Sequence, residues 1–263
     1  MNILSTIGCR AFQTGMKWAI PFPPYREPKI LHSVQQVPAL LQDQDISCVL
    51  LVTDRFLHNS GLIDPLKHAL TASGMGALTH AIEAYIGHST TQETQAYAIR
   101  AATLVAENLE KSYHDGNDMV ARSNMLNAAY LGGSAFSRSY VGYCHAVAHS
   151  LGGKYHTPHG LANAVLLPII LEDYGPAAHK GLAELADAVG IGGATAAEKA
   201  ENFIAAIRAM NERMGIPEGF DCIREEDLPR MTAWAEREAN PLYPVPVIYG
   251  EKDFARVLCR AML

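Results

Sequence analysis

The chain from Ser73 to its last residue is patterned for one helix after another, and this pattern limits the fold more than any other feature. Apolar residues recur at helical spacing from Met75 to Tyr85, which predicts a helix with one face in a core. The segment Thr90–Glu93 has the form of a capping box and predicts the start of the next helix. The small residues of 127–135 predict a buried helix in a tight bundle. Further helices are expected over 180–189, 196–214 and 226–239 and from Glu251, with an extended connector at 240–246.

The first part of the chain has a different pattern. Ile46–Thr53 is a β-branched, apolar run without a polar face, and it predicts a strand buried in a parallel sheet. Ser60–Leu70 predicts the helix that follows, with Pro65 near its first turn, where proline is tolerated. We therefore expect an α+β chain, with a partial α/β domain at residues 1–71 and an all-helical domain at residues 72–263.

Composition and charge exclude several classes of protein. Apolar residues make up 49% of the 263 residues and charged residues 18%, a balance too apolar for a disordered chain. No uncharged apolar run reaches the ~18 residues of a membrane span. The net charge of -6 argues against a nucleic-acid partner and favours a small molecule. Five scattered cysteines fit reduced thiols, and the first residues lack a secretory pattern, so we expect a cytoplasmic protein.

Four histidines lie between residues 145 and 159, a density that core packing does not require. His145 and His149 share one helix face because they are four residues apart. A break at Gly152–Gly153 and a helix start at Thr157, with Pro158 in the first helical position, would bring His159 back toward them. A single histidine is more often a hydrogen-bonded core residue, but this clustering predicts a metal site. His156 is the weakest member, since it also fits a solvated loop.

Three segments resemble the iron-containing, group III alcohol dehydrogenases: Gly74–Tyr85, His145–His149 and Thr157–Ala164. The resemblance covers residues 73–263, which would be the helical metal-binding domain of that family. Residues 1–71 resemble the opening of its Rossmann-like nucleotide-binding domain.

This resemblance also implies roles for individual histidines. His80, His145 and His159 match the ligands of a divalent metal, which is Fe2+ in the family, with Zn2+ as the alternative. His149 matches a catalytic histidine that lies near the nicotinamide of the cofactor.

The chain departs from the family pattern at two places. Gly76 stands where the family has an aspartate ligand, one helical turn before His80, so three neutral imidazoles remain. Such a trio still holds a divalent ion in catalytic zinc sites, although a carboxylate would bind iron more tightly. The phosphate-binding loop is also missing between Leu70 and Gly74, and a complete dinucleotide domain needs about 100 residues or more.

Asp54 follows the expected strand and has two interpretations. A carboxylate at a strand end binds the ribose hydroxyls of NAD and disfavours the 2′-phosphate of NADP. The alternative is a helix or turn cap.

The sequence leaves three functions open. The resemblance implies hydride transfer between a short primary alcohol or aldehyde and NAD. The alternative is a catalytically impaired, metal-binding helical remnant or interaction module, because the phosphate loop and the aspartate ligand are missing. Hydrolysis by a metal-bound hydroxide is a third function, with Glu83 as the base, although Glu83 also fits a surface position or one behind the ligands. An incomplete sheet exposes an unpaired edge, so a homo-oligomer is expected.

Overall fold

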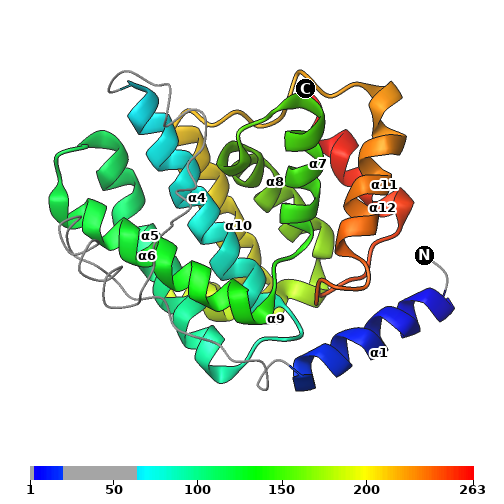
Figure 1. The fold of residues 1–263 in the computed structure, drawn as a ribbon. Helices are drawn as coiled ribbons and strands as arrows, with labels where there is room; N and C mark the ends of the chain where they lie inside the picture. Colours follow the sequence, from blue (N-terminus) through cyan, green and yellow to red (C-terminus); the bar gives the residue numbers. More distant parts are fainter. Residues whose placement is uncertain (1–2, 20–63) are drawn as a thin grey trace, which may run out of the picture.

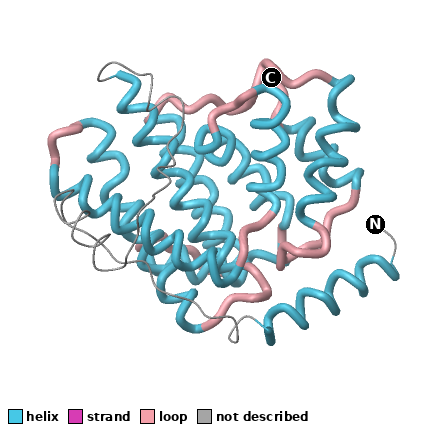
Figure 2. The backbone as a smooth tube through the Cα atoms, in the orientation of Figure 1, coloured by secondary structure: helices cyan, strands magenta, loops and turns pink. Residues whose placement is uncertain are grey.

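The structure, a computed structural model, describes residues 3–19 and 64–263, and it describes the side chains of the second range from residue 74 onward. This part of the chain is helical and has no strand (Figures 1 and 2). Its elements are α1 (Ile3–Ala19), α4 (Asp64–Ile86), α5 (Gln92–His114), α6 (Met119–Ser139), α7 (Tyr143–Tyr155), α8 (His159–Tyr174), α9 (Pro176–Ala188), α10 (Ala196–Arg213), the 3-10 helix η1 (Glu225–Asp227), α11 (Leu228–Ala239) and α12 (Glu251–Arg260).

The helical half of the expected α+β fold is confirmed. The expected strand at 46–53 and the rest of the Rossmann-like remnant lie outside the described residues, apart from α1 and the start of α4. α4 begins at Asp64, so Pro65 lies in its first turn as expected, and the helix then continues without interruption to Ile86. The expected domain boundary at residues 71 and 72 therefore falls inside a single helix.

Helices α4, α5 and α6 pack against one another and form one side of the molecule (Figure 1). α5 faces its neighbours with a stripe that includes the buried residues Ala102, Val105 and Leu109. α6 approaches α4 closely at Gly132, where a Cβ atom would lie 2.9 Å from the Ala77 carbonyl oxygen. The small residues of the 127–135 segment thus permit the close packing that the sequence predicts. The expected full burial of this helix is wrong, because Asn127 and Ala129 are exposed and only one face is buried.

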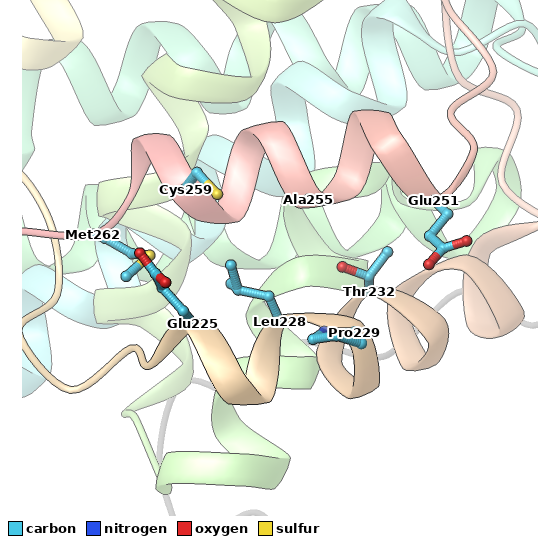
Figure 3. Close-up of a pocket in the computed structure, with 8 residues that line it drawn as sticks. All are labelled: Glu225, Leu228, Pro229, Thr232, Glu251, Ala255, Cys259 and Met262. Atoms are coloured by element: carbon cyan, nitrogen blue, oxygen red, sulfur yellow. The ribbon is translucent and has the colours of Figure 1, made fainter.

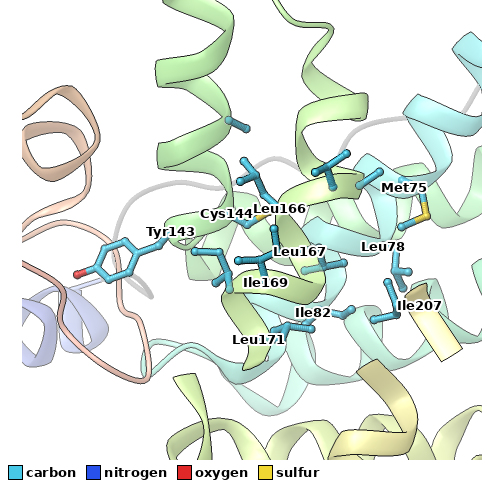
Figure 4. Close-up of a cluster of buried hydrophobic side chains, with 14 of the residues drawn as sticks. Met75, Leu78, Ile82, Tyr143, Cys144, Leu166, Leu167, Ile169, Leu171 and Ile207 are labelled. Atoms are coloured by element: carbon cyan, nitrogen blue, oxygen red, sulfur yellow. The ribbon is translucent and has the colours of Figure 1, made fainter. Parts of the chain in front are cut away.

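α8 is the central helix, and every residue from Ala162 to Leu171 is buried. A helix that is apolar on all sides can lie only inside a bundle, because any exposed face would leave apolar surface in water. Its side chains Leu166, Leu167 and Ile169 meet residues of α4, α7 and α10 in one core (Figure 4). The outer helices thus hold α8, and with it His159, in a fixed position.

The reversal between α7 and α8 occurs later than the sequence suggests. α7 continues through Gly152–Gly153 to Tyr155, so the expected break at this glycine pair is wrong. The chain turns at His156, which adopts the left-handed conformation at φ 57°. Pro158 is the residue before α8 and no side chain caps that helix, so the expected Thr157 cap is also wrong. His159 is nevertheless in the first turn of α8.

The capping box of α5 is present but shifted by one residue. Thr91 is the capping residue, and its side-chain oxygen accepts a hydrogen bond from the Thr94 backbone N–H. The Thr94 hydroxyl oxygen accepts from the Thr91 N–H, so threonine replaces the expected Glu93 in the reciprocal contact. Thr90 and Thr91 each carry a hydroxyl oxygen that could cap the helix, and the sequence pattern alone does not distinguish between them.

The expected helices near 180–189, 196–214 and 226–239 and the last helix from Glu251 are confirmed within a few residues. The connector between α11 and α12 contacts α1 (Figure 1). The Arg10 guanidinium donates to the carbonyls of Val245 and Pro246, at 2.7 Å each. The buried Gln13 donates to the Tyr243 carbonyl at 2.7 Å. None of the helices in the described residues combines the length and apolarity that crossing a bilayer requires.

Candidate metal and active site

Four histidines from three helices meet beside the central helix: His80 on α4, His145 and His149 on α7, and His159 at the start of α8. The ring centroids of His80 and His145 are 4.5 Å apart, and those of His145 and His159 are 5.3 Å apart. His149 stacks on His159 with a centroid distance of 5.1 Å. Residues 79 positions apart in the sequence are thus brought into one cluster, which we call the histidine cluster.

Glu83 supports the His145 ring through a hydrogen bond. Its side chain is 2% exposed, and its Oε2 atom lies 2.5 Å from His145 Nδ1. The same carboxylate accepts hydrogen bonds from the backbone N–H groups of Gly142 and Cys144, both at 2.8 Å. A Cβ atom at position 142 would lie 2.6 Å from Glu83 Oε1, so a larger residue there would displace this carboxylate. Glu83 therefore fixes both the first turn of α7 and the ring of His145.

His145 has one nitrogen in use and one free. Nδ1 is engaged by Glu83, while Nε2 is buried and has no hydrogen-bond partner among the described residues. A buried polar atom without a partner is destabilising by about 1–3 kcal/mol, so it calls for a bound group. A metal-ligating histidine has this same arrangement, with a carboxylate on one ring nitrogen and the cation on the other.

Desolvation within the cluster lowers the pKa of His80 and His159, although His80 is half-buried and His159 is exposed as whole residues. Burial first, and then the neighbouring rings with His145 foremost, lower the pKa of His80 to about 3. Burial, followed by the rings of His145 and His149, lowers the pKa of His159 to about 4. Neutral imidazole is the form that ligates a metal, so both side chains have a lone pair available near pH 7.

The ring orientations do not complete a coordination sphere. Within residues 3–19 and 64–263, no group of three or more His, Cys, Asp or Glu side chains is arranged to hold a metal ion. His159 Nε2 lies 3.0 Å from the Asn163 amide nitrogen, and the His80 ring is stacked between Phe136 and His145. The three imidazoles fit a divalent cation in donor type and proximity, although they do not form a three-ligand site in this arrangement.

His149 lies at the exposed edge of the histidine cluster. Its side chain is 45% exposed, and its Nδ1 atom is 2.6 Å from Glu238 Oε1 on α11. The hydrogen bond to Glu238 raises the pKa of His149, against the opposing effect of burial. The Tyr243 hydroxyl donates to the same Glu238 oxygen at 2.7 Å.

Gly76 leaves open space on α4, one turn before His80. A Cβ atom at this position would have no atom within 4 Å outside its immediate helix, although the residue itself is buried. This space admits a larger side chain, so the missing carboxylate reflects the sequence and not steric exclusion.

Other sequence candidates lie away from the cluster or outside the described residues. His156 is exposed and forms the end of α7, which fits the solvated loop residue. Cys144 is fully buried, and burial raises the pKa of its thiol well above the ordinary value. The thiol is therefore protonated, which fits a packing role. Asp54 lies outside the described residues. A pocket of about 590 Å³ between α11 and α12 is lined by none of the four histidines (Figure 3).

Three contacts of the cluster were not predicted from the sequence: those of Glu238, Asn163 and Phe136. Asn163 is one helical turn after His159, so the contact between these two side chains could have been predicted from their spacing. Glu238 is 89 residues from His149, and no local pattern relates them.

The fold and the cluster define a helical domain whose histidines meet between three of its helices. Residues 70–262 match the sequence pattern of the Fe-containing alcohol dehydrogenase family, C-terminal. The chain therefore belongs to this family.

Individual relatives agree with this assignment. The 1,3-propanediol dehydrogenase of Klebsiella pneumoniae is 40% identical over 221 residues, which cover 80% of this chain and 57% of that protein. The NAD-dependent methanol dehydrogenase of Bacillus methanolicus is 33% identical, over 76% of this chain and 52% of that protein. The crystal structure of a 1,3-propanediol oxidoreductase superposes with a TM-score of 0.72 at 36% identity, over 74% of this chain and 52% of the other. The chain thus spans little more than half the length of these relatives.

Proposed function

We propose that this protein is a metal-dependent alcohol dehydrogenase that transfers a hydride between a short primary alcohol or aldehyde and NAD. The family supports the class of reaction, and the names of two relatives specify small alcohols as their substrates. The observation that carries the proposal is the unpartnered, buried Nε2 of His145 beside two further neutral imidazoles.

His80, His145 and His159 would hold one divalent cation, which is Fe2+ by family membership or Zn2+ by the chemistry of sites with three imidazoles. When bound, the cation supplies Lewis-acid polarisation of the alcohol oxygen, and NAD supplies the hydride acceptor. Glu83 keeps the His145 ring in place and its Nε2 lone pair free. His149, at the exposed edge, would contact the nicotinamide and move a proton to or from the substrate oxygen.

We also propose that residues of the first part of the chain bind NAD. Asp54 would accept hydrogen bonds from the ribose of NAD, and the name of the methanol dehydrogenase relative supports NAD over NADP. We keep residues 1–71 as the partial nucleotide-binding domain and 72–263 as the catalytic domain.

Metal-loaded protein is expected to form NADH from a short primary alcohol, followed by absorbance under anaerobic conditions. His145→Ala should lower this rate on the order of 100-fold or more, because it removes a ligand whose supporting contacts alone are worth 10–100-fold in such sites. His114→Ala is the control, since His114 is exposed at the end of α5 and should leave the rate unchanged. If the unmodified protein produces no NADH at high NAD, the catalytically impaired metal-binding remnant is the better description.

We propose a cytoplasmic homo-oligomer. Ile3, Leu4 and Trp18 on α1 are 79%, 81% and 74% exposed, and apolar surface of this kind is commonly covered by self-association. Cys9, Cys144, Cys222 and Cys259 are free thiols, which fits a reducing compartment.

Light scattering after size exclusion is expected to give a mass above the 28.5 kDa of one chain. Leu4→Lys combined with Trp18→Lys should shift the protein toward the monomer by placing charges in the covered surface. The same mass for the unmodified and the double variant would contradict a contact through α1.

A further inference from the structure

His149 is connected to α1 through a continuous series of contacts that the proposed chemistry does not use. Its Nδ1 atom lies 2.6 Å from Glu238 Oε1, and the Tyr243 hydroxyl donates to that oxygen at 2.7 Å. Tyr243 in turn is fixed at its backbone. Its N–H donates to the Ala239 carbonyl at 2.7 Å, and its carbonyl accepts from Gln13 of α1, also at 2.7 Å.

This series gives Glu238 a defined position. Glu238 lies in the last turn of α11, a helix that packs against α7, and its Oε1 atom is held from one side by a tyrosine that is only 8% exposed. The His149 ring is bounded on another side by the stacked ring of His159, with an interplanar angle of 20°. An otherwise exposed imidazole is thus restrained at one nitrogen and one face.

We propose that Glu238 is a positioning residue that fixes the ring and the tautomer of His149, with the proton on Nδ1 and the lone pair on Nε2. An ionised carboxylate only accepts hydrogen bonds, so the nitrogen that it contacts must carry the proton. In the neutral ring, Nε2 is then the acceptor available at the edge of the histidine cluster. The catalytic consequence of this arrangement rests on the proposed function, whereas the arrangement itself does not.

A role in stability alone is disfavoured by the exposure of the pair. The side chains of His149 and Glu238 are 45% and 35% exposed, and ion pairs with such access to water contribute about 0–1 kcal/mol. Glu238→Ala should therefore lose little stability from the ion pair itself. The Tyr243 hydroxyl also loses its acceptor, which costs about 1–3 kcal/mol, so the variant is expected to fold with a modestly lower unfolding midpoint in urea and with a reoriented His149.

The test uses nitrogen NMR of metal-free protein labelled at histidine. A pH series identifies the range in which the His149 ring is neutral, which begins above the ordinary histidine value of about 6.5 because Glu238 raises the pKa of His149, and the tautomer is read in that range. The His149 signals are assigned by their loss in His149→Gln. We expect Nδ1 to carry the proton in the unmodified protein and in Glu238→Asp. In Glu238→Ala the two tautomers should become mixed. Glu236→Ala removes the same charge from the same helix, two residues away, and should keep the original signals.

The same Nδ1-protonated signals in Glu238→Ala and in the unmodified protein would overturn the proposal. In metal-loaded protein, Glu238→Ala should lower kcat on the order of 10- to 100-fold with little change in KM for the alcohol, the size seen when residues that orient a site histidine are removed. An unmodified protein without turnover but with the expected tautomer shift would leave the positioning role intact and reject only the dehydrogenase.

Discussion

Replacing Glu83 by alanine is expected to lower the free energy of unfolding of the metal-free protein by about 3–5 kcal/mol. The reason is that two backbone N–H groups and the His145 imidazole lose their common acceptor in a fully buried position. Urea unfolding followed by circular dichroism measures this change. This loss is a large share of the total stability of a native protein, which is about 5–15 kcal/mol.

Two further variants make the Glu83 prediction specific. Glu83→Gln keeps the volume of the side chain but turns an NH2 group toward the same donors, so it should lose roughly 2–3 kcal/mol and still fold. Glu110→Ala is the control, because Glu110 forms a surface ion pair with Arg213 and such pairs contribute about 0–1 kcal/mol. A loss in Glu83→Ala no greater than in Glu110→Ala would show that Glu83 does not organise the start of α7.

Gly76→Asp is expected to tighten the binding of Zn2+ or Fe2+ on the order of 100- to 1000-fold. A carboxylate about 4 Å from a unit positive charge gains about 4 kcal/mol at an effective dielectric constant of about 20, and each 1.4 kcal/mol is tenfold in affinity. The open space at Gly76 admits the new side chain. Competition with a chelator of known affinity measures the change, under anaerobic conditions for Fe2+.

Gly76→Ala is the matched control for Gly76→Asp. Alanine fills the same open space and stabilises a helix by about 0.5–1 kcal/mol relative to glycine, without adding a ligand. It should therefore raise the stability of the metal-free protein slightly and leave the metal affinity as it is. Equal metal affinities in the alanine and aspartate variants would refute the alignment of α4 with the metal-binding helix of the family.

Parts of the site were predictable because they are local in the sequence. Four-residue spacing places His145 and His149 on one face of α7, and the need to bury α8 on all sides follows from its composition. The exact turn was not predictable. The glycine pair remains helical, and the reversal at His156 follows from where α8 must pack, which no short pattern encodes.

The carboxylates that contact the histidines, Glu83 and Glu238, could not be assigned from local sequence patterns. Glu83 lies one turn after His80, and the sequence alone allowed either a surface position or one behind the ligands. The fold settles this by placing the start of α7 against α4 and burying Glu83. Glu238 had no signal at all, since its contact with His149 exists only because α11 packs against α7.

By itself, the sequence determined the helical character of residues 72–263, the family, and the identity of the histidines that meet. Periodicity and short motifs are local properties, so they can be recognised without knowledge of the fold. Only the tertiary structure decided which carboxylate supports which imidazole and which nitrogen is left free. Those choices depend on burial and on contacts between distant helices, and both arise only when the chain is packed.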